Sequence, residues 1–123
     1  MKFMKQLFLE DLKDKTEQQV LEHIISNFEI KLEELNGIKL IAGYESVGNY
    51  GCDSSNWFLF ERDGKLYEVN GSHCSCYGFE GQWKPEETTL EYLKSDKCPF
   101  YAGGYDDNAE SNHKQMYEFL QTL

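Results

Sequence analysis

The sequence predicts an α+β fold, in which a small antiparallel sheet with a central hairpin at about residues 57–70 packs against N-terminal and C-terminal helices. Three observations support this prediction. An apolar stripe with helical spacing crosses residues 20–35, the pair Asp63-Gly64 separates two apolar runs, and a second apolar stripe ends the chain. A length of 123 residues is typical of one domain, so we assign residues 1–123 to a single domain.

The N-terminal part is predicted to form two helices. Apolar residues at helical spacing favour a short amphipathic helix over residues 3–13. Thr16 is expected to cap the next helix, because its hydroxyl can accept a hydrogen bond from the first turn. That helix is predicted to continue to Gly37, since one apolar stripe includes Val20, Leu21, Ile24, Ile25, Phe28, Leu32 and Leu35.

The middle of the chain is predicted to form the sheet. Residues 38–45 indicate a strand, and Asp63-Gly64 is typical of a type I′ turn, which places Arg62 opposite Lys65. This register assigns one face of the hairpin to the core, with Phe58, Phe60, Tyr67 and Val69. The other face is half apolar and is expected to be partly covered, since it carries Trp57, Leu59 and Leu66 beside Glu61 and Glu68.

Two further helices are predicted after the hairpin. Pro85 suits the first position of a helix that continues to about Lys94, with acidic residues at its positive end. The last helix begins at about Ala109 and carries the apolar residues Met116, Tyr117, Phe119, Leu120 and Leu123. The loop at residues 71–84 contains three glycines and an unusual His-Cys-Ser-Cys run.

The charge of the chain narrows the classes of partner. The net charge is −10, from 22 acidic and 12 basic residues, and Arg62 is the single arginine. Direct binding of nucleic acid or of an anionic membrane needs a basic surface, so we expect neither. No targeting signal is recognisable and no stretch approaches a membrane span, so we expect the cytoplasm as the location. A protein partner with a basic surface fits this charge.

The His-Cys-Ser-Cys run is the candidate for metal or thiol chemistry. A zinc module is an alternative function, with ligands from His73, Cys74, Cys76 and Cys98. A small thiol-dependent enzyme is a second alternative, because His73 can lower the pKa of a neighbouring thiol. The chain lacks the C-x-x-C pair of a zinc knuckle, and adjacent side chains diverge. We therefore favour a structural loop without a cofactor, and binding over enzymatic activity.

A candidate partner-binding surface combines aromatic residues in loops with nearby acids. Tryptophan and tyrosine are enriched at the energetic centres of interfaces, and carboxylates suit a basic partner. The candidate residues are Tyr77, Phe79, Glu80, Trp83, Glu86, Glu87, Asp106 and Asp107. The chain also lacks a Walker loop and the HExxH and GxSxG motifs, which favours binding over catalysis.

Residues 66–93 resemble a family of small uncharacterised proteins encoded by phages and prophages. The likeness is carried by SHCSCYGFEGQW at residues 72–83 and by PEETTLEYL at residues 85–93. It implies an accessory protein of a mobile element, acting in the cytoplasm of the host cell. In that setting the expected function is anti-defence: inhibition of a basic, nucleic-acid-processing immune enzyme of the host, such as one of the CRISPR type.

Overall fold

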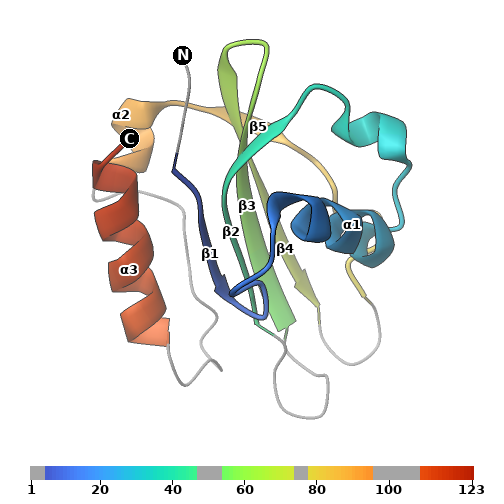
Figure 1. Cartoon of the computed structure of the whole chain (residues 1–123), viewed down its shortest axis with the longest axis horizontal. Helices are drawn as coiled ribbons and strands as arrows, with labels where there is room; N and C mark the ends of the chain where they lie inside the picture. The colour runs from blue at the N-terminus through green and yellow to red at the C-terminus, as the bar shows by residue number, and fades with distance from the viewer. Residues whose placement is uncertain (1–4, 47–53, 74–77, 96–108) are drawn as a thin grey trace.

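The computed structural model describes residues 5–46, 54–73, 78–95 and 109–123, with an α+β fold around one mixed sheet (Figure 1). Five strands lie in the order β1-β2-β3-β4-β5. Their bounds are β1 Leu7–Glu10, β2 Lys39–Ser46, β3 Ser54–Arg62, β4 Lys65–His73 and β5 Glu86–Thr88. Strand β1 runs parallel to β2, and the other neighbouring pairs are antiparallel.

The central hairpin confirms the predicted register. Arg62 lies opposite Lys65, and the pairing continues without a shift to Ser54 opposite His73. Asp63 and Gly64 have φ values of 53° and 79°, the positive values that a type I′ turn requires at both central positions. Two residues at the turn therefore set the face of every side chain in β3 and β4.

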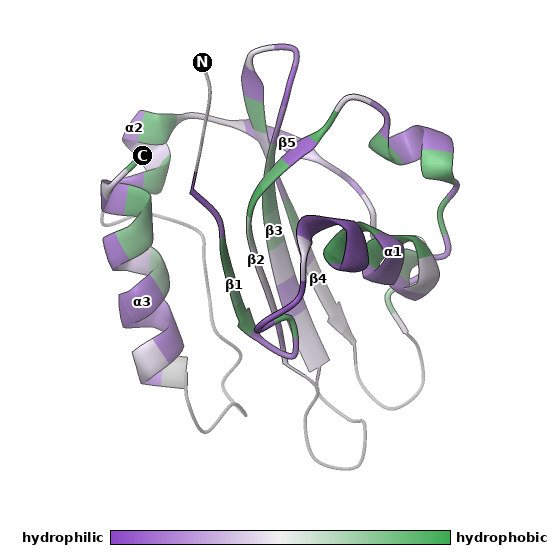
Figure 2. Ribbon diagram, viewed as in Figure 1, coloured by the Kyte–Doolittle hydropathy of each residue, from purple (hydrophilic) through white to green (hydrophobic). Residues whose placement is uncertain are grey.

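Helices cover both faces of the sheet (Figure 1). The helix α1, Glu17–Phe28, packs on the face predicted as core, where Val20, Ile24 and Phe28 join Phe58, Phe60 and Val69. The helix α3, Ala109–Gln121, and the short helix α2, Leu90–Leu93, cover the other face. There Met116, Leu120 and Leu93 pack against Trp57, Leu59 and Leu66, so the half-apolar face is covered, as predicted. Figure 2 shows hydrophobic and hydrophilic residues alternating along α1 and α3, as expected for amphipathic helices.

The start of α1 also confirms a sequence prediction. Thr16 is the N-cap, its hydroxyl accepts a hydrogen bond from the Gln19 amide, and the Gln19 side chain accepts one from the Thr16 amide. This reciprocal capping box satisfies two backbone donors that the first turn would leave unpaired.

We expect Thr16→Ala to lower the free energy of unfolding by about 1 kcal/mol, because it removes the acceptor for the Gln19 amide. Urea unfolding followed by circular dichroism measures this loss. Thr122→Ala is the control. The Thr122 hydroxyl donates to the Phe119 carbonyl just after α3 and does not cap the N-terminus of a helix. Equal losses in the two variants would contradict the assigned capping role.

Three predicted elements were wrong. Residues 3–13 were predicted as a helix, but Leu7–Glu10 forms the strand β1. Leu9 joins the cluster beneath α3, and Phe8 packs against the cluster beneath α1. A strand covered on both faces carries consecutive apolar residues, which periodicity does not distinguish from a short helix.

The second error concerns the length of α1, which ends at Phe28. Glu29 follows with a left-handed φ of 52°, and the amide of Ile30 donates to the carbonyl of Ile25 at 3.2 Å. That closing hydrogen bond is typical of a helix C-terminus. The apolar residues beyond it belong to a separate 3₁₀ turn, η1 Leu32–Leu35, in which Leu32 is 66% exposed.

The third error concerns the residues after Pro85. They form the edge strand β5 rather than a helix, and Thr89 caps the shorter helix α2 by accepting a hydrogen bond from the Tyr92 amide at 3.1 Å. Proline is tolerated beside an edge strand because no ladder hydrogen bond is required there. In the described part of the chain, no helix has the length and apolar character needed to cross a membrane.

Candidate functional site

A polar groove runs along the edge of the sheet where β5 pairs with β4. It consists of two hollows of about 300 Å³ and 220 Å³, which share Glu68, Asn70 and Glu86. The larger hollow is also lined by Glu87, Thr88, Thr89 and Tyr92, and the smaller by Gly81, Gln82 and Lys84. We call this site the β4–β5 groove.

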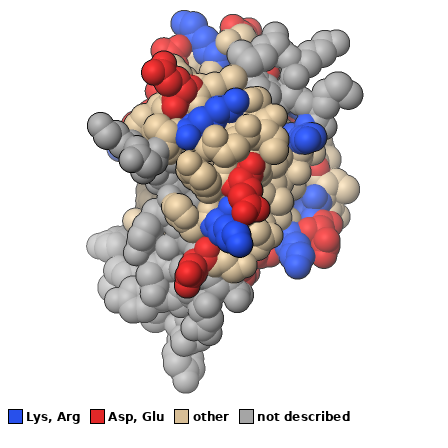
Figure 3. All heavy atoms as spheres, turned by 90° about the vertical axis from the view of Figure 1, so that its left-hand side faces the viewer, with Lys and Arg blue, Asp and Glu red and all other residues tan. Residues whose placement is uncertain are grey.

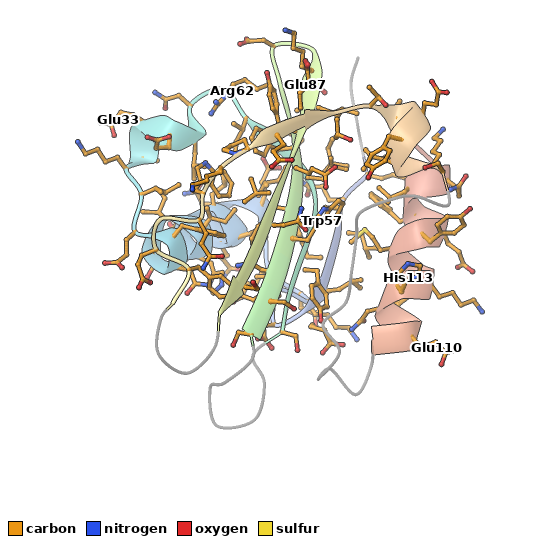
Figure 4. All side chains as sticks on the ribbon, turned by 180° about the vertical axis from the view of Figure 1, so that it is seen from behind. Glu33, Trp57, Arg62, Glu87, Glu110 and His113 are labelled. Carbon is orange, nitrogen blue, oxygen red and sulfur yellow. The ribbon has the colours of Figure 1, made fainter. Side chains whose placement is uncertain are left out.

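Glu68 lines both hollows of the β4–β5 groove and is only 6% exposed. Its Oε1 accepts a hydrogen bond from the Trp57 indole Nε1 at 3.1 Å, and the Asn70 side-chain nitrogen lies 3.5 Å away. Figure 4 shows Trp57 over the middle of the sheet, below the segment that carries β5 and α2. The buried tryptophan therefore holds one oxygen of a nearly buried carboxylate in a defined position.

Glu86 lies directly opposite Glu68 in the β4–β5 ladder, so two carboxylates belong to one cross-strand pair. Like charges in directly opposed positions repel and destabilise a sheet. Within the described ranges, neither carboxylate forms an ion pair with a lysine or arginine, although Lys84 lines the smaller hollow. The groove therefore carries negative charge that the surrounding described residues do not neutralise.

The other predicted acids have local partners. Glu87 lies opposite Tyr67, and its Oε1 is 3.7 Å from Lys65 Nζ, with both side chains more than half exposed. Glu80 is exposed, and its Oε1 accepts a hydrogen bond from the Gly78 amide at 3.3 Å. Both residues remain available to solvent, and Glu87 borders the β4–β5 groove.

The predicted aromatic contacts need a correction. Phe79 is 2% exposed and belongs to the core cluster beneath α1, so it is a packing residue rather than a surface contact. Trp83 is partly buried, with its ring centroid 5.9 Å from that of Phe60 and 5.2 Å from that of Phe28. Tyr77, Asp106 and Asp107 lie outside the described residues.

The predicted zinc ligands are not placed by the structure. Cys74, Cys76 and Cys98 lie outside the described residues, as does the side chain of His73. Among the residues that are described, no group of three or more His, Cys, Asp or Glu is arranged to hold a metal ion. The zinc module and the thiol-dependent enzyme therefore stay predictions.

A second polar cluster, which the sequence analysis did not predict, lies beneath α1. The buried Glu45 carboxylate is 2.6 Å from His23 Nε2 and accepts hydrogen bonds from Asn27 at 2.7 Å and Asn56 at 3.0 Å. The Oδ1 atom of Asn56 is buried without a partner, and so is Ser54 Oγ on the same strand. This cluster joins α1 to β2 and β3.

The face that carries α3 has a different character. Figure 3 shows acidic and basic side chains interspersed over it. A surface of mixed sign does not select strongly for a basic partner. The β4–β5 groove, where buried and exposed carboxylates meet, is therefore the better candidate site.

Glu68 and Tyr92 were not among the predicted site residues. The signal for Glu68 was its position on a face with Trp57, Leu59 and Leu66, where an acid is out of place. Tyr92 was assigned to a helix without a role, and it is 41% exposed at the groove.

Comparison with known proteins finds no relative of this chain. No family model matches the chain, and no curated protein or solved structure is significantly similar to it. The resemblance to small phage proteins, suggested by residues 66–93, therefore stays a prediction.

Proposed function

We propose that this protein is a phage-type anti-defence factor that binds and inhibits a basic, nucleic-acid-processing immune enzyme of the host, such as one of the CRISPR type. The observation that carries the proposal is the β4–β5 groove, where Glu68 and Glu86 face the same hollow without an ion pair to a described residue. Inhibition follows if acidic side chains occupy the positions at which the enzyme binds phosphates.

The overall charge supports the same partner class. A net charge of −10 attracts basic proteins over several ångströms and accelerates their encounter at low salt. The resemblance to phage and prophage proteins supports the cellular setting. Neither feature selects a particular enzyme, so the groove supplies the local specificity.

Capture from a bacterial host lysate, followed by an activity assay, tests the proposal. We expect the tagged protein to retain a nucleic-acid enzyme at low salt, to release it at about 0.5 M NaCl, and to inhibit its cleavage of nucleic acid. The double variant Glu68→Gln/Glu86→Gln is expected to weaken inhibition by at least about tenfold, because it neutralises both carboxylates.

The matched control is Glu110→Gln/Glu118→Gln, which removes the same charge from exposed positions on α3. It is expected to inhibit like the original protein. The proposal fails if no basic nucleic-acid enzyme is retained, or if a retained enzyme cleaves its substrate at an unchanged rate.

A further inference from the structure

We infer that the β4–β5 groove is a receptor for a single arginine side chain of the partner. This inference rests on the proposed function and names the group that the groove recognises. It depends on three described features: a nearly buried carboxylate, a like-charged residue opposite it, and an exposed aromatic ring at the same hollow.

The nearly buried carboxylate of Glu68 favours binding of a cation. Both hydrogen bonds to Glu68 go to Oε1, and no described residue donates to Oε2. A carboxylate that is 6% exposed loses most of its hydration, and this loss is costly unless an opposite charge compensates it. Glu86, directly opposite, adds repulsion that a cation between the two groups would convert into attraction.

The arrangement of acceptors favours a guanidinium over an ammonium group. Thr88 lines the larger hollow, but its Oγ1 is buried, so the carboxylates of Glu68 and Glu86 are the acceptors that a ligand there can reach. Glu68 and Glu86 offer their carboxylate oxygens from the neighbouring strands β4 and β5. A guanidinium presents five N–H donors in a plane and can serve several such acceptors at once, whereas an ammonium group is a compact charge with three donors.

The exposed ring of Tyr92 supports the same choice. It lines the hollow of about 300 Å³ together with Glu68 and Glu86, and its side chain is 41% exposed. Guanidinium groups stack on aromatic rings and gain a cation–π attraction there. A divalent metal ion fits less well, because calcium requires six to eight oxygen ligands and no described group of acids is arranged to hold a metal.

Nuclear magnetic resonance offers a direct test, because the Trp57 indole N–H is hydrogen-bonded to the receptor carboxylate. The chain has two tryptophans, so Trp83→Phe assigns the two indole signals. The probes are three capped tripeptides, acetyl-Gly-X-Gly-amide, in which X is arginine, lysine or citrulline. Citrulline keeps the shape of arginine without its charge.

We expect the arginine peptide to shift the Trp57 indole signal saturably, the lysine peptide to bind about tenfold more weakly, and the citrulline peptide to cause no shift. Glu68→Gln and Glu86→Gln should each weaken arginine binding by about tenfold. The amide oxygen introduced by Glu68→Gln can still accept from Trp57, and Glu86 is exposed, so both variants are expected to fold. Glu118→Gln should bind like the original protein, within about twofold.

Equal binding of lysine and arginine, binding of citrulline, or an effect of calcium chloride equal to that of the arginine peptide would overturn the inference. The lysate experiment separates this failure from failure of the proposed function. If the original protein and Glu68→Gln/Glu86→Gln inhibit an enzyme equally, the proposed function stands and the groove is not the site of inhibition. If the arginine peptide binds but no enzyme is captured, the inference of an arginine receptor stands and the proposed function fails.

Discussion

Glu45→Ala is expected to lower the free energy of unfolding by about 4 kcal/mol, the largest loss we expect from a single polar residue of this protein. The Glu45 side chain is 3% exposed and accepts hydrogen bonds from His23, Asn27 and Asn56. Alanine removes the acceptor for all three donors while leaving them in place, and Asn56 is only 4% exposed to water. An unpaired buried donor costs its full desolvation energy.

Urea unfolding measures the loss, and two variants control it. Glu45→Gln keeps one acceptor oxygen for Asn27 and Asn56 and is expected to cost about half as much. Glu118→Ala makes the same truncation at an exposed position of α3 and should change stability by less than about 0.5 kcal/mol. If Glu45→Ala is as stable as Glu118→Ala, the polar cluster does not hold α1 to the sheet.

Gly71→Ala is expected to destabilise the protein by about 3 kcal/mol, because one added methyl group has no space. A Cβ atom at Gly71 would lie 2.3 Å from Asn56 Oδ1 and 2.9 Å from Phe79 Cδ1. Neither neighbour can move away cheaply. Asn56 is held by its hydrogen bond to Glu45, and Phe79 is 2% exposed in the core.

Gly78→Ala is the matched control for this substitution. The nearest atom to its added Cβ is Glu80 Oε2 at 2.6 Å, at the far end of an exposed side chain that can rotate. We expect a loss below about 1 kcal/mol there. The double variant Asn56→Ala/Gly71→Ala should lose at least about 1 kcal/mol less than the sum of the single variants, since the clash needs both residues. Additive losses would contradict the contact.

Local signals predicted the hairpin and the start of α1 correctly. Asp63-Gly64 sets the turn type with two residues, and the turn then places Phe58, Phe60, Tyr67 and Val69 on one face. Thr16 caps α1 through a bond to a residue three positions away. In each case the interacting groups are close in the sequence, so the sequence pattern is sufficient to predict the local structure.

The wrong elements are those whose conformation depends on a distant partner. Residues Leu7–Glu10 become a strand because they pair with Ala42–Glu45, far along the chain. Residues Glu86–Thr88 become a strand because Leu66–Glu68 offers a free edge. The helical spacing of the first segment and the Pro-Glu-Glu start of the second describe local preferences, which pairing and burial override.

The candidate site was likewise predicted in part, and the missing part depends on contacts between distant segments. Sequence reasoning identified Glu86 and Glu87 as acids for a basic partner, and it placed Glu68 on the half-apolar face with Trp57. It did not place Glu86 opposite Glu68, because that contact exists only when β5 pairs with β4. The hairpin register and the cap of α1 could be predicted from residues that are neighbours in the sequence. The groove and the Glu45 cluster arise from contacts between distant segments, because their free energy comes from burial and pairing that no local pattern encodes. The register predicted that the second face is covered, but only the tertiary structure shows that α2 and α3 cover it.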